Sequence, residues 1–489
     1  MRTGYNRSCH RLRSLLAFCP LLLAGAAVPS LAQTAATVTV NAASPLATIP
    51  TAAFGVNTAV WDSGLFAPAI PHLLTSVGVT ALRFPGGSTS DEYHWQTGTG
   101  GGGNPAITFD KFMGLVQQIK AVPIITVNYG SDAAGTGGGD PSEAAGWVDY
   151  ANNAKKYGVK YWEIGNEIYG NGEYGAKWEK DLHSDHSPTA YGSNVVTFVN
   201  AMKAKDPAIK VGVVLASPGD WPDGQKPDWN SAVLAACGTK IDFVIVHWYA
   251  GNPGSESDAK LLASTDSIAA KMPKLRSLIR QYCSNAPNMP IFVTETNSVS
   301  SNPGKQTVSL VNSLFTADNF MRWLENGAAN VDWWALHNGA TAGNVSPSLY
   351  GSGTYGDYGI LANGSNGELP ADTPFPSYYG IQMLTRLGKP GDQTVSASST
   401  QSLLSVHAVK QANGSLALLL INKSPSVSYT ANISVSGYTP AAASTVYTYG
   451  QNSTAITSAG GRTGSRFTQT MLPYSMATVV LTQKGRHRH

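Results

Sequence analysis

The sequence predicts an α/β fold, a (β/α)8 TIM barrel followed by a C-terminal antiparallel β-sandwich domain. Short apolar runs alternate with segments of helical spacing over about 330 residues, as eight β-then-α units would require. Polar side chains gather directly after several of these runs. Beyond residue 390 the pattern changes to short β-type runs separated by Asn-Gly, Ser-Pro and Gly-Gly turns, which is typical of a sandwich.

The N-terminal segment predicts export. Basic residues precede an apolar run over residues 15–28, and Ser30-Leu31-Ala32 then offers the small residues that a signal peptidase needs. We therefore expect residues 1–32 to be a signal peptide and the mature protein to be secreted or periplasmic. The basic residues are Arg2, Arg7, Arg11 and Arg13. Losing these four arginines changes the formal net charge from +3 to −1, so the basic balance gives no support for nucleic-acid binding.

The bulk properties fit a loop-rich extracellular globule. Only 13% of the 489 residues are charged, while glycine numbers 51 and tyrosine 21. After the signal peptide no stretch is long and apolar enough to predict a membrane span. Cys237 and Cys283 remain in the mature chain, where a disulfide and two separate buried thiols are equally compatible with the sequence.

The elements follow in order along the chain. Residues 33–52 form an N-terminal strand region, whose alternating segment 37–40 can add a strand to the sandwich. The barrel is expected over residues 53–390, with helices over 109–119, 143–157 and 377–386. Its eight strand candidates are 53–57, 80–84, 123–128, 160–164, 210–215, 242–247, 291–294 and 331–336.

The sandwich is expected over residues 391–489. Its β-type runs are 403–409, 415–422, 427–434, 445–449, 467–471 and 477–482.

The carboxyl ends of the barrel strands are unusually polar. Because loops after the strands of a barrel share one face, residues far apart in the sequence converge there. Glu167 follows the fourth strand candidate and Glu295 the seventh, on opposite sides of an eight-stranded ring. Either glutamate alone is more often a solvated or helix-capping residue. Together they predict a pair that flanks one glycosidic bond, with Glu295 as nucleophile and Glu167 as acid and base.

Several motifs resemble those of the family 51 α-L-arabinofuranosidases, within the wider clan A of retaining glycosidases. Residues 82–87, Leu-Arg-Phe-Pro-Gly-Gly, resemble the second-strand motif of that family. Residues 161–167, Tyr-Trp-Glu-Ile-Gly-Asn-Glu, resemble its Asn-Glu acid/base motif, and residues 247–249 and 294–297 are similar to its later motifs. The resemblance runs from about residue 54 to 336, with a similar β-domain behind it.

The resemblance implies a role for each matching residue. It implies that Glu167 is the acid/base and Glu295 the nucleophile, and that Asn166 bonds the sugar 2-hydroxyl. Arg83 would help to fix the nucleophile and the sugar. His247 and Tyr249 would complete the surroundings of the nucleophile. The alternative for His247 is a buried, hydrogen-bonded core residue with no role in the site.

The sugar is less clearly specified than the reaction. The family usually has a glutamate near the end of its first strand, where this chain reads Phe-Gly-Val-Asn and ends on Asn57, a further candidate for sugar binding. Ser88 also stands where an asparagine is common. The expected substrate is a polysaccharide or oligosaccharide, and the resemblance favours an arabinofuranoside. A clan A β-glycosidase or endo-glycanase acting on xylan, glucan or a glucuronide is the first alternative, and a non-catalytic carbohydrate-binding protein is the second.

No cofactor or metal is expected. Residues 183–186, His-Ser-Asp-His, lack further ligands at a recognisable spacing, and the glycine run 98–103 lacks the Lys-Ser/Thr of a phosphate loop. No sequence feature specifies an oligomeric state. Five tryptophans are candidates for stacking on sugar faces, some of which must instead be core: Trp221, Trp229, Trp248, Trp333 and Trp334.

Overall fold

A computed structural model of the chain describes residues 33–342 and 355–485. The predicted signal peptide, residues 1–32, lies outside this range, as does the end of the basic C-terminal tail.

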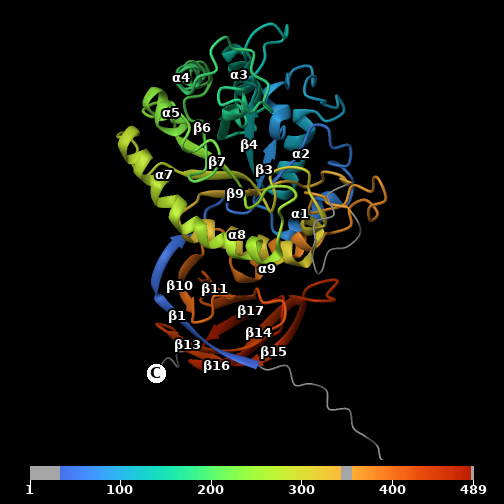
Figure 1. The fold of residues 1–489 in the computed structure, drawn as a ribbon, viewed down its shortest axis with the longest axis vertical. Coiled ribbons are helices and arrows are strands. Elements are labelled where there is room, and N and C mark those ends of the chain that lie inside the picture. The colour runs from blue at the N-terminus through green and yellow to red at the C-terminus, as the bar shows by residue number, and fades with distance from the viewer. Residues whose placement is uncertain (1–32, 343–354, 486–489) are drawn as a thin grey trace, which may run out of the picture. The chain divides into compact units, whose positions relative to one another are not determined.

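Eight parallel strands close into a barrel in sequence order, and β9 pairs with β2 to complete the ring (Figure 1). Each of the eight strand candidates overlaps one of these strands, so the predicted TIM barrel is confirmed. The strands are β2 (Gly55–Asn57), β3 (Ala81–Phe84), β4 (Val122–Val127), β5 (Tyr161–Ile164), β6 (Lys210–Leu215), β7 (Phe243–Tyr249), β8 (Ile291–Asn297) and β9 (Asn330–Trp333).

Large and small side chains alternate inside the barrel. The ring of Tyr161 lies 5.8 Å from that of Phe243 and 5.0 Å from that of Phe292. A Cβ at Gly212, on the neighbouring strand, would come within 2.3 Å of the Phe243 ring, so glycine makes room for this aromatic layer. The apolar layer fills one end of the barrel and leaves the polar strand ends to form the site.

Helices follow the barrel strands and cover them (Figure 1). They are α1 (Ile70–Val77), α2 (Phe109–Ile119), α3 (Pro141–Val148), α4 (Pro188–Lys205), α5 (Trp229–Cys237), α6 (Asp258–Ser264), α7 (Ile268–Tyr282), α8 (Leu310–Glu325) and α9 (Pro376–Leu387). α2 has its predicted bounds and α9 nearly so. The helix predicted over 143–157 is instead α3 followed by a wider π-helical stretch over Asp149–Ala154.

A second sheet of nine strands has the order β15-β14-β17-β12-β11-β10-β1-β13-β16. β1 lies inside it, antiparallel to β10 and parallel to β13, so the alternating segment 37–40 belongs to this sheet. The strands are β1 (Gln33–Thr48), β10 (Gln393–Ser399), β11 (Leu404–Lys410), β12 (Leu416–Asn422), β13 (Ser428–Ser436), β14 (Pro440–Gly450), β15 (Thr457–Arg462), β16 (Arg466–Met471) and β17 (Ser475–Gln483).

The sequence did not predict β10 or β15. Both are polar, with the sequences QTVSASS and TSAGGR, and neither shows the apolar alternation of a half-buried strand. Val446 of β14 and Phe467 of β16 come from near opposite ends of the strand order and pack on the same apolar core. The sheet therefore folds over its own core, as the predicted sandwich requires.

β12 is buried on both faces because it joins the two domains. Leu418 and Leu420 belong to the sandwich core, whereas Leu419 and Ile421 belong to the apolar core that continues into the barrel. A group of buried charges also crosses this boundary, and we call it the junction cluster: Asp318 and Glu325 of α8, His407 of β11 and Lys423.

None of the described helices has the length and apolar character needed to cross a membrane. The structure contains Cys237 and Cys283 as two buried free thiols. The Cys237 Sγ donates a hydrogen bond to the Val233 carbonyl at 3.2 Å.

Candidate active site

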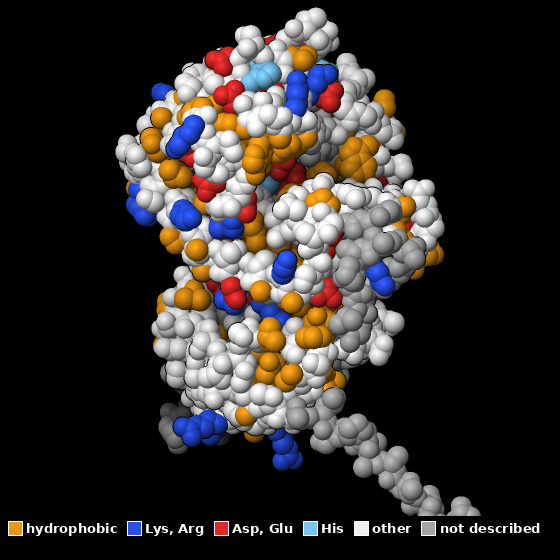
Figure 2. Space-filling model, in the orientation of Figure 1, with side chains coloured by type: hydrophobic (Ala, Val, Ile, Leu, Met, Phe, Trp, Pro, Cys, Tyr) orange, Lys and Arg blue, Asp and Glu red, His pale blue; other side chains and the backbone are white. Residues whose placement is uncertain are grey.

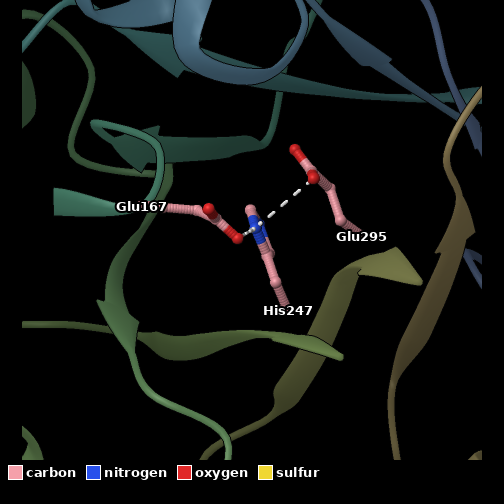
Figure 3. Close-up of side chains that lie close together, drawn as sticks. All are labelled: Glu167, His247 and Glu295. Atoms are coloured by element: carbon pink, nitrogen blue, oxygen red, sulfur yellow. Dashed lines mark hydrogen bonds and ion pairs between the residues drawn. The ribbon is translucent and has the colours of Figure 1, made fainter. Parts of the chain in front are cut away.

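Two carboxylates and one histidine meet at the mouth of the barrel (Figure 3). Glu167 follows β5, His247 lies on β7 and Glu295 on β8. The His247 Nδ1 lies 2.9 Å from the Glu167 Oε1 and 3.6 Å from the Glu295 Oε2. The ligand atoms of all three lie within 4.8 Å of one another. The two glutamates predicted from the sequence as a pair are thus in one site.

The end of β5 turns sharply at Gly165, which has φ +72°. A Cβ there would come within 2.7 Å of the Ile168 side chain, so the turn needs glycine both for its conformation and for its space. The turn stops the buried strand after Ile164 and brings Asn166 and Glu167 to the mouth.

Glu295 is almost completely buried and held by two donors. Arg83 donates from Nη1 to its Oε1 at 2.8 Å, and the Tyr249 hydroxyl donates to its Oε2 at 2.7 Å. Burial and the nearby charge of Glu295 raise the pKa of Tyr249 well above its usual value, so Tyr249 stays a neutral donor. Two donors thus hold this carboxyl in a fixed orientation, as a carboxylate nucleophile would require.

Arg83 organises the site from the inside of the barrel. It is fully buried and also donates from Nε to Glu163 at 2.7 Å, from Nη1 to Asn57 at 3.0 Å and from Nη2 to Asn166 at 2.9 Å. Burial lowers the pKa of Arg83, but the charges of Glu163 and Glu295 outweigh this effect and raise it above its usual value. The guanidinium is therefore a permanent cation that fixes four partners at once.

Glu167 lies nearer the solvent, with 17% of its side chain exposed. Besides His247, the Tyr169 hydroxyl donates to its Oε1 at 2.9 Å and the Trp178 Nε1 donates to its Oε2 at 2.8 Å. Burial raises the pKa of Glu167, but hydrogen bonding and charge from His247, with the bonds from Tyr169 and Trp178, bring it below its usual value.

The mouth has an aromatic rim beside Glu167. Trp178 and Trp221 are 44% and 39% exposed, and their rings are 5.1 Å apart. In Figure 2, acidic and histidine side chains are visible in a hollow whose rim is partly hydrophobic. Of the tryptophans named from the sequence, Trp229, Trp248 and Trp333 are buried in the core.

The remaining candidates all lie at the site, in different positions. Asn57 is fully buried. Its amide nitrogen donates to the Thr294 carbonyl at 2.8 Å, and its side-chain oxygen accepts from Arg83. The His247 Nε2 lies 3.1 Å from the Thr294 hydroxyl, which orients the ring. Asn166 is buried between Arg83 and Glu179.

Sequence reasoning missed five residues of this arrangement: Asp91, Glu163, Tyr169, Trp178 and Glu179. Glu163 carried a usable signal, because a carboxylate inside an otherwise buried strand requires a partner. Glu179 and Asp91 carried none, since Glu179 lies in a loop and Asp91 ends a short 3-10 helix, and acidic residues in such connecting segments are usually solvated.

The three ligand atoms could in principle hold a cation, and among the described residues this is the one His/Cys/Asp/Glu group with such spacing. Arg83, Tyr249, Tyr169 and Trp178 already donate to its carboxylates. His183, in the loop that the sequence did not predict to be a metal site, binds Asp181 and stacks on Tyr129.

No model of a known protein family matches the chain. A probable α-L-arabinofuranosidase C of Aspergillus fumigatus is 24% identical over 179 residues, which is 31% of this chain and 32% of that protein. An intracellular exo-α-(1→5)-L-arabinofuranosidase of Acetivibrio thermocellus is 24% identical over 236 residues, 42% of this chain and 43% of that protein. The chain thus matches less than half the length of these relatives.

Solved structures match over almost the whole chain. An α-L-arabinofuranosidase of Thermotoga maritima has a TM-score of 0.70 at 19% identity, covering 91% of this chain and 99% of that one. A family 51 arabinofuranosidase of Xanthomonas axonopodis has a TM-score of 0.70 at 16% identity, covering 92% and 100%. The fold is that of the family 51 arabinofuranosidases. The resemblance seen in the motifs is therefore confirmed by the fold.

The family 51 fold is shared more widely. A family 44 xyloglucanase of Paenibacillus polymyxa has a TM-score of 0.67 at 14% identity, covering 92% of this chain and all of that one.

Proposed function

We propose that this protein is a retaining glycoside hydrolase with α-L-arabinofuranosidase-like activity. The observation that carries the proposal is the approach of Glu167 and Glu295 to within 4.8 Å across the mouth of the barrel. Inverting enzymes keep their carboxyl groups about 6.5–9.5 Å apart to accommodate a water, whereas retaining enzymes place them about 5–5.5 Å apart.

In the first step Glu295 attacks the anomeric carbon. The bond from this carbon to the leaving oxygen breaks, a bond to a Glu295 oxygen forms, and Glu167 gives its proton to the leaving oxygen. Free Glu167 has a lowered pKa, so its proton must be supplied for this step. A bound sugar excludes water from the carboxylate, which raises the pKa of Glu167 and so favours its protonated form.

In the second step Glu167 acts as a base. Its carboxylate takes a proton from a water molecule, the water oxygen attacks the anomeric carbon, and Glu295 departs as a carboxylate. The lowered pKa of Glu167 suits this step, because the base must be ionised. Two inversions at one carbon give net retention.

Arabinofuranosides are the proposed substrates because the curated relatives and family 51 structures are named for that activity. One observation favours a second candidate, an endo-acting β-glycanase. The buried Asn57 stands where the family usually has a sugar-binding glutamate, and xyloglucanase and glucanase-xylanase structures share the fold.

A panel of 4-nitrophenyl glycosides and polysaccharides tests the proposal. The α-L-arabinofuranoside should be hydrolysed fastest, and Glu295→Ala should abolish turnover while Glu173→Gln, on an exposed loop, should not. Faster release from xylan or β-glucan would favour the endo-glycanase. Binding of these polymers without turnover of any glycoside would leave a carbohydrate-binding protein.

Stereochemistry is tested separately with Glu167→Ala. Added azide should restore turnover of an activated substrate and give a glycosyl azide of retained configuration, because azide needs no base. An azide of inverted configuration would rule out the double displacement.

We also propose that the protein acts outside the cytoplasm after removal of residues 1–32. N-terminal sequencing of protein from culture medium or periplasm should begin near Gln33, and an intact Met1 would contradict export.

A further inference from the structure

A second pair of carboxyls lies behind Asn166. Glu179 is 1% exposed, and its Oε1 accepts hydrogen bonds from the Ser88 hydroxyl at 2.7 Å and from the Asn166 amide at 2.9 Å. Asp91 is fully buried and accepts from the backbone N–H of Asn166 at 2.9 Å and from that of Tyr129 at 3.2 Å. Both carboxyls therefore hold the residue that precedes Glu167.

The Asp91 and Glu179 carboxyls also lie within reach of a hydrogen bond to each other. Among the described residues, no N–H or O–H group donates to the Glu179 Oε2. Two carboxyl oxygens can bond to each other only if one of them carries a proton. Burial, followed by the charges of Asp91 and Glu167, raises the pKa of Glu179 well above its usual value, and burial raises that of Asp91 to about 7.

Within the part of the chain that the structure describes, no cation beside this pair is available to neutralise a second carboxylate. Asp181 and Glu167 add negative charge near the pair. The nearest basic side chains are engaged elsewhere, since Lys180 pairs with Glu92 and His183 with Asp181. Arg83 contacts Asn166 on its other side, through the amide oxygen.

We propose that Glu179 is a neutral carboxylic acid that shares its proton with Asp91 and acts as a positioning residue for Asn166 and Glu167. The inference rests on the proposed function, because it assigns a role within that site. Asn166 can take one orientation only: its oxygen must face the Arg83 donor and its nitrogen must face the Glu179 acceptor. One hydrogen of the Asn166 amide nitrogen then remains for a sugar hydroxyl.

The neutral state of Glu179 also protects the acid/base residue. An ionised Glu179 would add a negative charge near Glu167 and raise its pKa. Keeping the proton between Glu179 and Asp91 leaves His247, Tyr169 and Trp178 to set the pKa of Glu167.

Glu179→Ala and Glu179→Gln separate the positioning role from a structural one. Alanine removes the acceptor for Ser88 and Asn166, so kcat should fall about tenfold or more while KM changes less. Glutamine mimics the neutral acid, since its oxygen accepts from Ser88 and Asn166 and its amide donates to Asp91. It should restore most of the activity that alanine loses. Glu173→Gln is the matched control, and thermal unfolding of each variant verifies the fold.

The pH dependence of kcat/KM provides a result that would contradict the proposal. If Glu179 is neutral in the wild type, the alkaline limb of kcat/KM should lie at the same pH in Glu179→Gln as in the wild type. A limb shifted to lower pH would show that glutamine removed a negative charge next to Glu167, and it would overturn the proposal. Glutamine as inactive as alanine would do the same.

An infrared measurement needs no turnover and so stands apart from the proposed function. At neutral pH the infrared difference spectrum of wild type minus Glu179→Gln should contain the C=O stretching band of a protonated carboxyl, sensitive to deuterium exchange. The difference removes the bands of Asp332 and Asp357, because burial raises the pKa of both and both remain in the variant. Lack of this band in the difference spectrum would overturn the shared proton even if the protein hydrolyses arabinosides. Its presence in an inactive protein would leave the shared proton standing and remove only the role in catalysis.

Discussion

Two groups of buried charges can be compared, one at the barrel mouth and one at the junction between barrel and sandwich. The mouth cluster is Arg83, Glu163, Glu167, His247 and Glu295, in which Arg83 is the permanent cation facing Glu163 and Glu295. The junction cluster reverses this arrangement, because several cations surround the carboxylate Asp318. The His407 Nε2 lies 2.8 Å and the Lys423 Nζ 2.6 Å from its oxygens.

The clusters differ in charge balance and in access. In the junction cluster the two carboxylates face three cations, because the second ring nitrogen of His407 binds Glu325 at 2.9 Å and the Arg322 Nε lies 3.7 Å from Asp318. Asp318 and His407 are fully buried. The mouth cluster has more carboxylates than permanent cations, and Glu167 is 17% exposed. Burial of charge alone therefore does not mark an active site. A surplus of acid groups that still reaches solvent does.

The largest expected effect is on the chemistry of the mouth cluster. Glu295→Gln keeps the shape of the side chain but removes the proposed nucleophile, so kcat should fall by about 10⁴-fold or more. Stability should change little by comparison. Turnover of an aryl arabinofuranoside and chemical unfolding measure the two quantities, and a variant with near wild-type kcat would remove Glu295 from the mechanism.

The junction cluster should show the opposite result. Asp318→Ala leaves His407 and Lys423 without their shared carboxylate, which should lower the free energy of unfolding by about 3–5 kcal/mol. The kcat of the folded fraction should stay close to that of the wild type. Urea unfolding and active-site titration test this, and a loss of kcat comparable to that of Glu295→Gln would mean that the two clusters are coupled.

Arg83→Lys should lower kcat by about 10²-fold. A lysine ammonium cannot bind Glu163, Asn166 and Glu295 in one plane as the guanidinium does. The control is Arg322→Lys beside the junction cluster, where the arginine is 30% exposed and its side chain pairs with Asp266 at the surface. Equal kinetic effects of both substitutions would contradict the role of Arg83 in holding Glu163, Asn166 and Glu295 in place.

Stability should fall as the pH rises above neutrality. Burial lowers the pKa of His407, but Glu325 and Asp318 outweigh it and raise that pKa to about 9. Between about pH 6.5 and 9 the folded state thus binds more protons than the unfolded state, so the contribution of His407 is complete below this window and is lost across it. The raised pKa of Asp91 has the same sign but acts at lower pH, since its contribution is lost between about pH 4 and 7. Unfolding midpoints across the His407 window should decline less steeply for His407→Gln, and an equal slope would contradict the assignment.

The smallest effect is expected at the rim of the mouth. Trp178→Phe keeps an aromatic ring but removes the donor to the Glu167 Oε2, so kcat should fall by about tenfold or less. The alkaline limb of kcat/KM should move to higher pH, because the lost hydrogen bond had lowered the pKa of Glu167. Trp221→Phe is the control, and an alkaline limb that moves equally in both variants would argue against this bond.

The sequence by itself determined the eight barrel strands, because alternation of apolar runs with amphipathic helices is a local property of the chain. It also paired Glu167 with Glu295, since strands four and seven of a closed ring must face each other. Only the tertiary structure decided the partners of the buried charges. Glu163 lies 80 residues from Arg83, and Glu295 lies 212 residues from it. Closure of the barrel brings both glutamates to one guanidinium, and no local sequence pattern predicts these contacts. The same holds for Asp91 and Glu179, whose loops are fixed by the residues that they contact.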